Sequence, residues 1–278
     1  MKIAIFGALA ALAFASAAQA ASPSATTVLS GYADVDYGYT NVHVSGLGGA
    51  DVNAYGGKAA VAFPVMDDWG AQIDGAVNDF VAPGSFGGGS QTVASPSGHL
   101  FYRNDQWLAG GFVGGELAPH INLVGGGVEG QLYTVPNFVF EGAIADGGVD
   151  KSGAPNLWAG RIGGKDFITK NLSVGASVDY VNANGGGLSA NLWTETLKGE
   201  YQLDSAPVAL TLGYEHANLS RLSVSADSVL VGVRWSFGGG SLHDRETKGA
   251  SLPSITDVFG GQAGQGLMGL VSAAYGSF

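Results

Sequence analysis

The sequence predicts an all-β fold, a transmembrane antiparallel up-and-down β-barrel of about 12 strands. Three observations lead to this prediction. Runs of about ten residues alternate apolar and polar side chains, which is the period of a strand with one apolar and one polar face. The chain begins with a segment typical of an export signal. No later segment approaches the run of about 20 apolar residues that a membrane helix needs.

Residues 1–20 have the layout of a cleaved signal peptide. Lys2 precedes an apolar run that begins at Ile3, and the segment ends in the small-x-small motif Ala18-Gln19-Ala20. We expect cleavage near Ala20 and a mature chain that is exported. The sequence contains no cysteine, so a disulfide framework is excluded, and a closed hydrogen-bonded barrel would supply rigidity instead.

The charge and composition narrow the classes of partner. Removing Lys2 from the 12 basic residues leaves 11 against 23 acidic ones, a formal charge of −12. Nucleic acid is therefore excluded as a partner. The chain has 47 glycines, yet 46% of its residues are hydrophobic, which is too apolar for a disordered polymer. This apolar surface must be buried or face lipid.

The clearest strand pattern runs from residue 69 to residue 78. Trp69, Ile73 and Val77 fall on one face, whereas Gln72 and Asp74 fall on the other. Including weaker runs, the predicted strands are 30–43, 52–63, 69–80, 98–103, 106–116, 120–132, 138–146, 157–167, 172–182, 192–203, 207–217 and 227–237. The fourth and fifth runs are short, so ten strands is the alternative count.

The connections and the aromatic residues predict how the barrel, residues 21–237, is oriented. Short turns at 64–68, 104–105, 134–137, 169–171 and 204–207 alternate with mostly longer Gly-rich connections, as expected for periplasmic turns and extracellular loops. Aromatic side chains gather near both ends of the strands, including Tyr133, Phe167 and Phe80. The aromatics that we assign to the membrane interface are Trp69, Trp107, Trp158, Trp193, Trp235 and Phe237.

Residues 238–278 follow the last predicted strand and break the alternating pattern. They begin with Gly-Gly-Gly-Ser and a charged stretch, then become rich in Gly, Ala and Leu. We expect a periplasmic tail, either flexible or docked in the lumen of the barrel.

Three segments resemble a porin-like outer-membrane family of alphaproteobacteria. They are GHLFYRND (98–105), SVLVGVRWSF (228–237) and the following GGGSLHDRETKGASL (238–252). In that family a closing strand of the type VGLRWxF is followed by a tail resembling GGSLRDRDRxGASL. This chain departs from the tail pattern at His243 and Glu246. Members are largely uncharacterised, so the resemblance implies a barrel and little about chemistry.

The side chains predicted to face the lumen carry both charge signs. Eight acids face five bases. If these charges pair across the lumen, they stiffen the wall and block the passage. If they stay hydrated, the excess of acids predicts a water-filled passage with a mild preference for cations. With about 12 strands, the passage would be on the order of 10 Å wide after side chains are counted. The predicted lumen-lining residues are Asp34, Asp36, Lys58, Asp74, Glu129, Glu141, Arg161, Lys165, Asp179, Lys198, Glu200, Glu215 and Arg234.

Enzymatic and metal chemistry have weak support in the sequence. Glu215, His216 and Ser220 resemble a hydrolase set only loosely, because Ser220 falls in a connection. The five histidines, His99 among them, lack metal-ligand spacing and are interpreted as interfacial or loop residues. The Gly-Gly-Gly runs lead into no helix and cannot cradle phosphate. We therefore expect no catalytic residues, no metal site and no cofactor.

Two functional hypotheses remain. The first is a porin-like outer-membrane channel that passes ions or small polar solutes. The second is a closed structural or interaction barrel, whose lumen is blocked and whose loops and tail make the contacts. Both predict contact with outer-membrane lipid and, during biogenesis, with the barrel-assembly machinery. The sequence specifies neither the solute nor the oligomeric state.

Overall fold

The computed structural model describes residues 27–46, 48–82, 89–185, 188–221, 223–238 and 240–267. The predicted signal peptide, residues 1–20, lies outside these ranges, as does the end of the tail from residue 268. No helix in the described ranges is long and apolar enough to cross a membrane.

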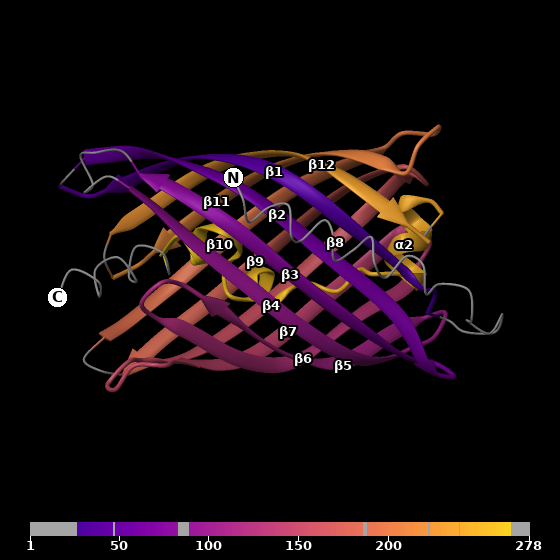
Figure 1. Ribbon diagram of the computed structural model, residues 1–278, viewed down its shortest axis with the longest axis horizontal. Helices are drawn as coiled ribbons and strands as arrows, with labels where there is room; N and C mark the ends of the chain where they lie inside the picture. The colour runs from indigo at the N-terminus through magenta and orange to yellow at the C-terminus, as the bar shows by residue number, and fades with distance from the viewer. Residues whose placement is uncertain are drawn as a thin grey trace.

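Twelve antiparallel strands form one closed barrel, which confirms the predicted fold class (Figure 1). Each strand pairs with its neighbours in sequence, and β1 pairs with β12 to close the sheet. The strands are β1 (Ser30–Val44), β2 (Gly48–Met66), β3 (Trp69–Ala82), β4 (Gly89–Arg103), β5 (Trp107–Leu117), β6 (Asn122–Val135), β7 (Phe138–Val149), β8 (Asn156–Thr169), β9 (Leu172–Gly185), β10 (Leu188–Gln202), β11 (Val208–Leu219) and β12 (Val224–Phe237).

Closure between β1 and β12 leaves no sheet edge. Gly31 lies opposite Phe237, and the ladder continues in register to Val44 opposite Val224. A closed ladder satisfies every strand's backbone hydrogen bonds without water, which is the requirement for crossing lipid with strands. The alternative of ten strands is thereby ruled out.

The strands are longer than the alternating pattern predicts, and the connections at one end are correspondingly shorter. We call the end where β1 begins and β12 finishes the terminal end, and the other the opposite end. At the opposite end, the expected loops 44–51, 183–191 and 218–226 shrink to connections 45–47, 186–187 and 220–223. Backbone pairing does not need apolar side chains, so hairpins continue past the point where hydrophobic alternation stops.

Strand β4 shows the largest difference from its prediction, since it starts at Gly89 rather than residue 98. The first half of this strand was not predicted because it contains Pro96, and proline has no N–H to donate to a ladder. In the structure, the ladder between β4 and β5 is interrupted at this proline. Ser95 and Pro96 have no partner on β5, between the pairs Ala94–Leu117 and Ser97–Gly114.

The outward face of the barrel is apolar. Val113 and Ile162 are each 69% exposed in the middle of their strands, as expected for side chains that contact lipid rather than water. The interface tryptophans Trp69, Trp107, Trp158 and Trp193 are also exposed, and Trp235 and Phe237 are partly exposed and lie against each other.

Three aromatics assigned to strand ends point inward instead. Phe167 is 3% exposed and packs with Val139 and Leu242, and Tyr133 packs against the same cluster. The ring of Phe80 faces Gly266 of the tail. The reason is strand parity, because Phe167 shares a face with Lys165, and Tyr133 shares one with Glu129.

The described part of the tail lies inside the barrel (Figure 1). Helix α2 (Leu242–Lys248) starts at a capping box made by Ser241 and Asp244. An extended stretch leads to the short helix α3 (Ile255–Val258), and residues 261–267 are helical again. Gly260 and Gly261 have positive φ values of 97° and 63°, which form the turn between the last two helices.

Candidate functional site: the lumen and the segment inside it

The barrel encloses a charged cavity of about 260 Å³ between its wall and the tail. The wall side comes from β1–β3 and β7–β12, and the tail side comes from α2, α3, the stretch between them and the start of the helical segment 261–267. Eleven of the thirteen residues predicted to line the lumen border this cavity: Asp34, Asp36, Lys58, Glu141, Arg161, Lys165, Asp179, Lys198, Glu200, Glu215 and Arg234. The other two, Asp74 and Glu129, are buried behind the tail.

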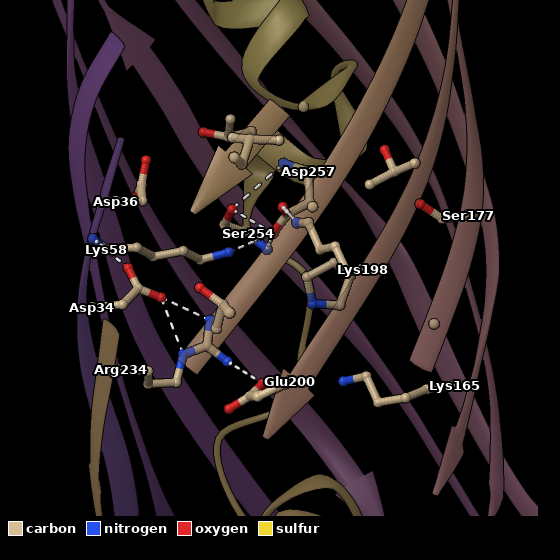
Figure 2. Close-up of a pocket in the computed structure, with 18 of the residues that line it drawn as sticks. Asp34, Asp36, Lys58, Lys165, Ser177, Lys198, Glu200, Arg234, Ser254 and Asp257 are labelled. Carbon is tan, nitrogen blue, oxygen red and sulfur yellow. Dashed lines mark hydrogen bonds and ion pairs between the residues drawn. The ribbon is translucent and has the colours of Figure 1, made fainter. Parts of the chain in front are cut away.

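Two wall arginines are paired with wall acids. Arg234 on β12 donates to Asp34 at 2.7 Å and to Glu200 at 3.0 Å, so it links β1, β12 and β10 (Figure 2). On the other side of the cavity, Arg161 on β8 donates to Glu141 at 3.0 Å and to Asp179 at 2.7 Å. These bridges neutralise buried charge and stiffen the wall.

Three wall lysines instead rely on the tail for their counter-charges. Lys58 on β2 lies 2.5 Å from the carboxylate of Asp257, and Lys198 on β10 lies 4.0 Å from the same carboxylate. Lys165 on β8 lies 2.5 Å from Glu246 of α2. We call Lys58, Lys165 and Lys198 the lysine trio. Figure 2 shows the three side chains extending into the space beside the tail.

Asp257 is the electrostatic centre of the docked tail. Burial alone would raise the pKa of its carboxyl, but the charges of Lys58, Lys198 and Arg161 hold that pKa well below its usual range. The same carboxylate accepts hydrogen bonds at 2.8 Å from the backbone N–H and the hydroxyl of Ser254, which caps α3. A buried carboxylate in this setting stays ionised.

A second cluster of charged groups lies in the wall next to α3. The two ring nitrogens of His99 contact Asp74 at 2.8 Å and Glu129 at 2.7 Å, and all three side chains are fully buried. Ser97 donates to Asp74 and also lies against the backbone N–H of Ile255. The interpretation of His99 as an interfacial or loop residue is therefore wrong, and its parity with inward Arg103 was the missed signal.

Wall side chains also hold the backbone of the tail between its two helices. Arg103 donates to the carbonyl of Gly249 at 3.0 Å. Gln72 makes a paired contact with Leu252, accepting from its N–H at 3.2 Å and donating to its carbonyl at 3.1 Å. Polar backbone that would otherwise be unpaired inside the barrel is thus satisfied by the wall. The sequence pattern placed Gln72 on the polar face of its strand, but neither Gln72 nor Arg103 was among the predicted lumen-lining residues.

Towards the opposite end, the tail closes the lumen with apolar side chains. Ile255, Val258 and Phe259 are at most 4% exposed and pack against inward residues of β5–β11, including Phe112 and Leu192. Burial of such side chains is a major source of docking free energy. The open passage on the order of 10 Å expected from the strand number is therefore largely occupied by the tail, and a charged cavity of about 260 Å³ remains beside it.

The geometry offers little for catalysis or metal binding. Glu215 points inward and accepts from the backbone N–H of Ala263, whereas His216 lies on the other face and contacts Asp227. These two groups therefore do not converge on one site. Among the described residues, no group of three or more His, Asp or Glu side chains is arranged to hold a metal ion. The lumen can bind and position charged groups, which is the chemistry of passage and recognition.

Comparisons with known proteins place the fold among outer-membrane barrels. The sequence matches no family model and no curated protein. The structure is similar to an outer membrane channel from Pseudomonas putida F1, with a TM-score of 0.60 and 8% identity over 75% of this chain and 95% of that one. It is also similar to the NanC porin, with a TM-score of 0.53 and 11% identity over 72% and 98%. At such identities the likeness shows a shared fold: this chain has the closed β-barrel architecture of solved outer-membrane channels.

Proposed function

We propose that this chain is a porin-like channel of the bacterial outer membrane, in which the chain's own tail occupies the lumen. The observation that carries the proposal is a closed 12-stranded barrel, apolar outside, whose interior holds a charged cavity of about 260 Å³. Cleavage near Ala20 and membership of the alphaproteobacterial porin-like family remain predictions within this proposal. The role we propose is transport, not catalysis.

The proposed passage carries ions or small polar solutes with a mild preference for cations. Support comes from the excess of acids on the inward face, since fixed negative charge raises the local concentration of cations. The passage runs along the cavity between the tail and the wall strands β1–β3 and β7–β12, and it widens when the tail moves. If the tail is truncated or displaced, it no longer fills the part of the lumen that Phe259 closes.

A closed structural barrel is the second candidate, and one observation favours it. Ile255, Val258 and Phe259 form a well-packed apolar cluster with the wall, and this is the packing of a permanent core. In that case the loops and the rim, not the lumen, would make the functional contacts.

Single-channel conductance of the folded protein distinguishes the two candidates. A protease site inserted between Gly238 and Gly240, which are both exposed, allows the tail to be cut after folding and then removed by a wash below about pH 4, before conductance is recorded at neutral pH. The matched control carries the same insertion in the exposed connection 150–155, where cleavage leaves the tail attached. We expect small conductance steps before cleavage, and larger steps with a cation-directed reversal potential after linker cleavage only. Silence in every state, with the barrel folded, would instead support the structural role.

A further inference from the structure

We propose that the lysine trio is a binding site for a small carboxylate-bearing solute, which the tail occupies with its own carboxylates. The proposal names a solute class for the channel and rests on that function for its biological meaning. Its structural basis is one arrangement: wall lysines from β2, β8 and β10 meet acids from the tail and no acid of the wall.

In the described structure no carboxylate of the wall forms an ion pair with these lysines, and wall acids such as Asp36 and Glu200 act on them only at longer range. Arg161 and Arg234 each form two ion pairs with wall carboxylates, so their charges are balanced whether or not the tail is present. Over the described residues, the ion pairs of Lys58, Lys165 and Lys198 reach only Asp257 and Glu246 of the tail. When the tail leaves, three ammonium groups therefore lose their partners together.

While the tail is docked, Lys198 and Lys165 can be reached from the cavity, whereas the position beside Lys58 is occupied by Asp257. The Lys198 side chain is 59% exposed and that of Lys165 is 31% exposed, and both border the same cavity of about 260 Å³. By contrast, the carboxylates of Asp34, Glu141, Asp179 and Glu200 are at most 16% exposed. Among these ion-paired groups, the ones most open to a solute in the cavity are thus cationic.

The carboxylate of Asp257, which occupies the site, shows which class of ligand the site can bind. At Asp257 a carboxylate meets one ammonium group at 2.5 Å and a second at 4.0 Å, and the Arg161 guanidinium donates to the backbone carbonyl of the same residue. A carboxylate from a solute would find the same donors. A local site of this kind is compatible with a mild cation preference, which depends on the net charge of the whole wall.

Competition between solute and tail provides the test. The chain has no cysteine, so Leu252→Cys introduces a single thiol at a position that is 3% exposed and buried by docking. Its labelling rate by a maleimide in detergent reports how often the tail undocks. If glutarate binds the undocked lumen, the rate rises in proportion to 1 + [glutarate]/Kd, about tenfold at ten times Kd. Ala250→Cys, 2% exposed, is a second reporter should the first fail to fold.

The controls separate a site from general screening. Sodium chloride at equal ionic strength and ethylammonium chloride should have little effect, and Lys58→Gln combined with Lys198→Gln should abolish the glutarate response. Lys151→Gln, in an exposed connection outside the lumen, should retain it. The proposal is overturned if glutarate acts no more strongly than chloride, or if the double variant responds like the parent. Equal potency of inorganic phosphate would overturn the carboxylate assignment. Because the assay needs no transport, its outcome is independent of the conductance result.

Discussion

At the residue scale, the lumen holds buried acids in two contrasting environments. Glu129 is 6% exposed and contacts His99, whereas Glu116 is 1% exposed and neither of its carboxylate oxygens has a hydrogen-bond partner in the described structure. Glu116 lies opposite Leu123 and beside the interruption in the β4–β5 ladder. A buried polar group without a partner costs free energy, while a paired one recovers much of it.

Substitution of these two acids should therefore change stability in opposite directions. We expect Glu116→Met to raise the free energy of unfolding by about 1–3 kcal/mol, because it removes an unpaired buried carboxyl. Glu129→Met should lower it, since His99 loses one of its two acidic partners. Urea unfolding in detergent, followed by tryptophan fluorescence, measures both. A loss of stability in both variants would contradict this reading of Glu116.

The docking of the tail should also depend on pH through Asp257. Its depressed pKa means that the stability it contributes is present above the unfolded pKa of about 3.9 and is lost as pH falls through the lower folded value. We expect the cleaved tail to remain bound from pH 8 to pH 5 and to be released only below about pH 4. Size-exclusion chromatography of the linker-cleaved protein measures retention. A cleaved tail that carries Asp257→Asn should bind the barrel less tightly at neutral pH. Release of the parent tail near pH 6 would contradict the assignment of the pH dependence to Asp257.

At the element scale, strand parity assigns each side chain to lipid or lumen. On β8, Ile162 and Asn156 both face outward, but Ile162 lies near the middle of the strand and Asn156 at its opposite end. The inward neighbours, Arg161 and Lys165, hold charge beside the tail. A one-residue slip would exchange these faces, so the register of each strand is strongly specified.

A charge placed on the outward face tests this assignment. Ile162→Arg should cost about 2–4 kcal/mol, because the guanidinium enters the apolar middle of the bilayer. The same substitution at Asn156 should cost about 0–1 kcal/mol, since this position is near the interface. Unfolding titrations of protein folded into lipid vesicles give both values. Equal costs at the two positions would mean that the barrel's outward face is not in lipid.

At the scale of the whole molecule, the barrel and the tail form one packed unit. The wall closes through β1 and β12, and the tail then returns into the lumen, where α2 packs near the terminal end and α3 further inside (Figure 1). Arg245 of α2 joins the bridge between Arg234 and Glu200 by donating to Glu200 at 2.5 Å. Residues distant in sequence thus share one charge network, and a change in the tail is felt by the wall.

The sequence by itself determined the strands and their faces. A period of two residues is a local property, so β3, β9 and β12 are evident from side-chain alternation, and the inward direction of Asp34 or Lys58 follows from parity. The same parity predicts that Phe167 and Tyr133 point inward. The prediction placed them at the membrane interface instead, because it gave more weight to the known preference of aromatic residues for interfaces. The ends of the strands could not be predicted from this pattern, because strand pairing beyond the lipid requires no apolar side chains.

Only the tertiary structure decided what fills the lumen. The capping box at Ser241 is visible in the sequence and favours a helix, but nothing local to it specifies whether that helix lies in water or against the wall. Lys58 and Asp257 are 199 residues apart, and their contact depends on the tail lying inside the closed barrel. The destination of the tail depends on the summed burial of Ile255, Val258 and Phe259 and on charges contributed by non-neighbouring strands. Such non-local terms have no periodic signature in the chain.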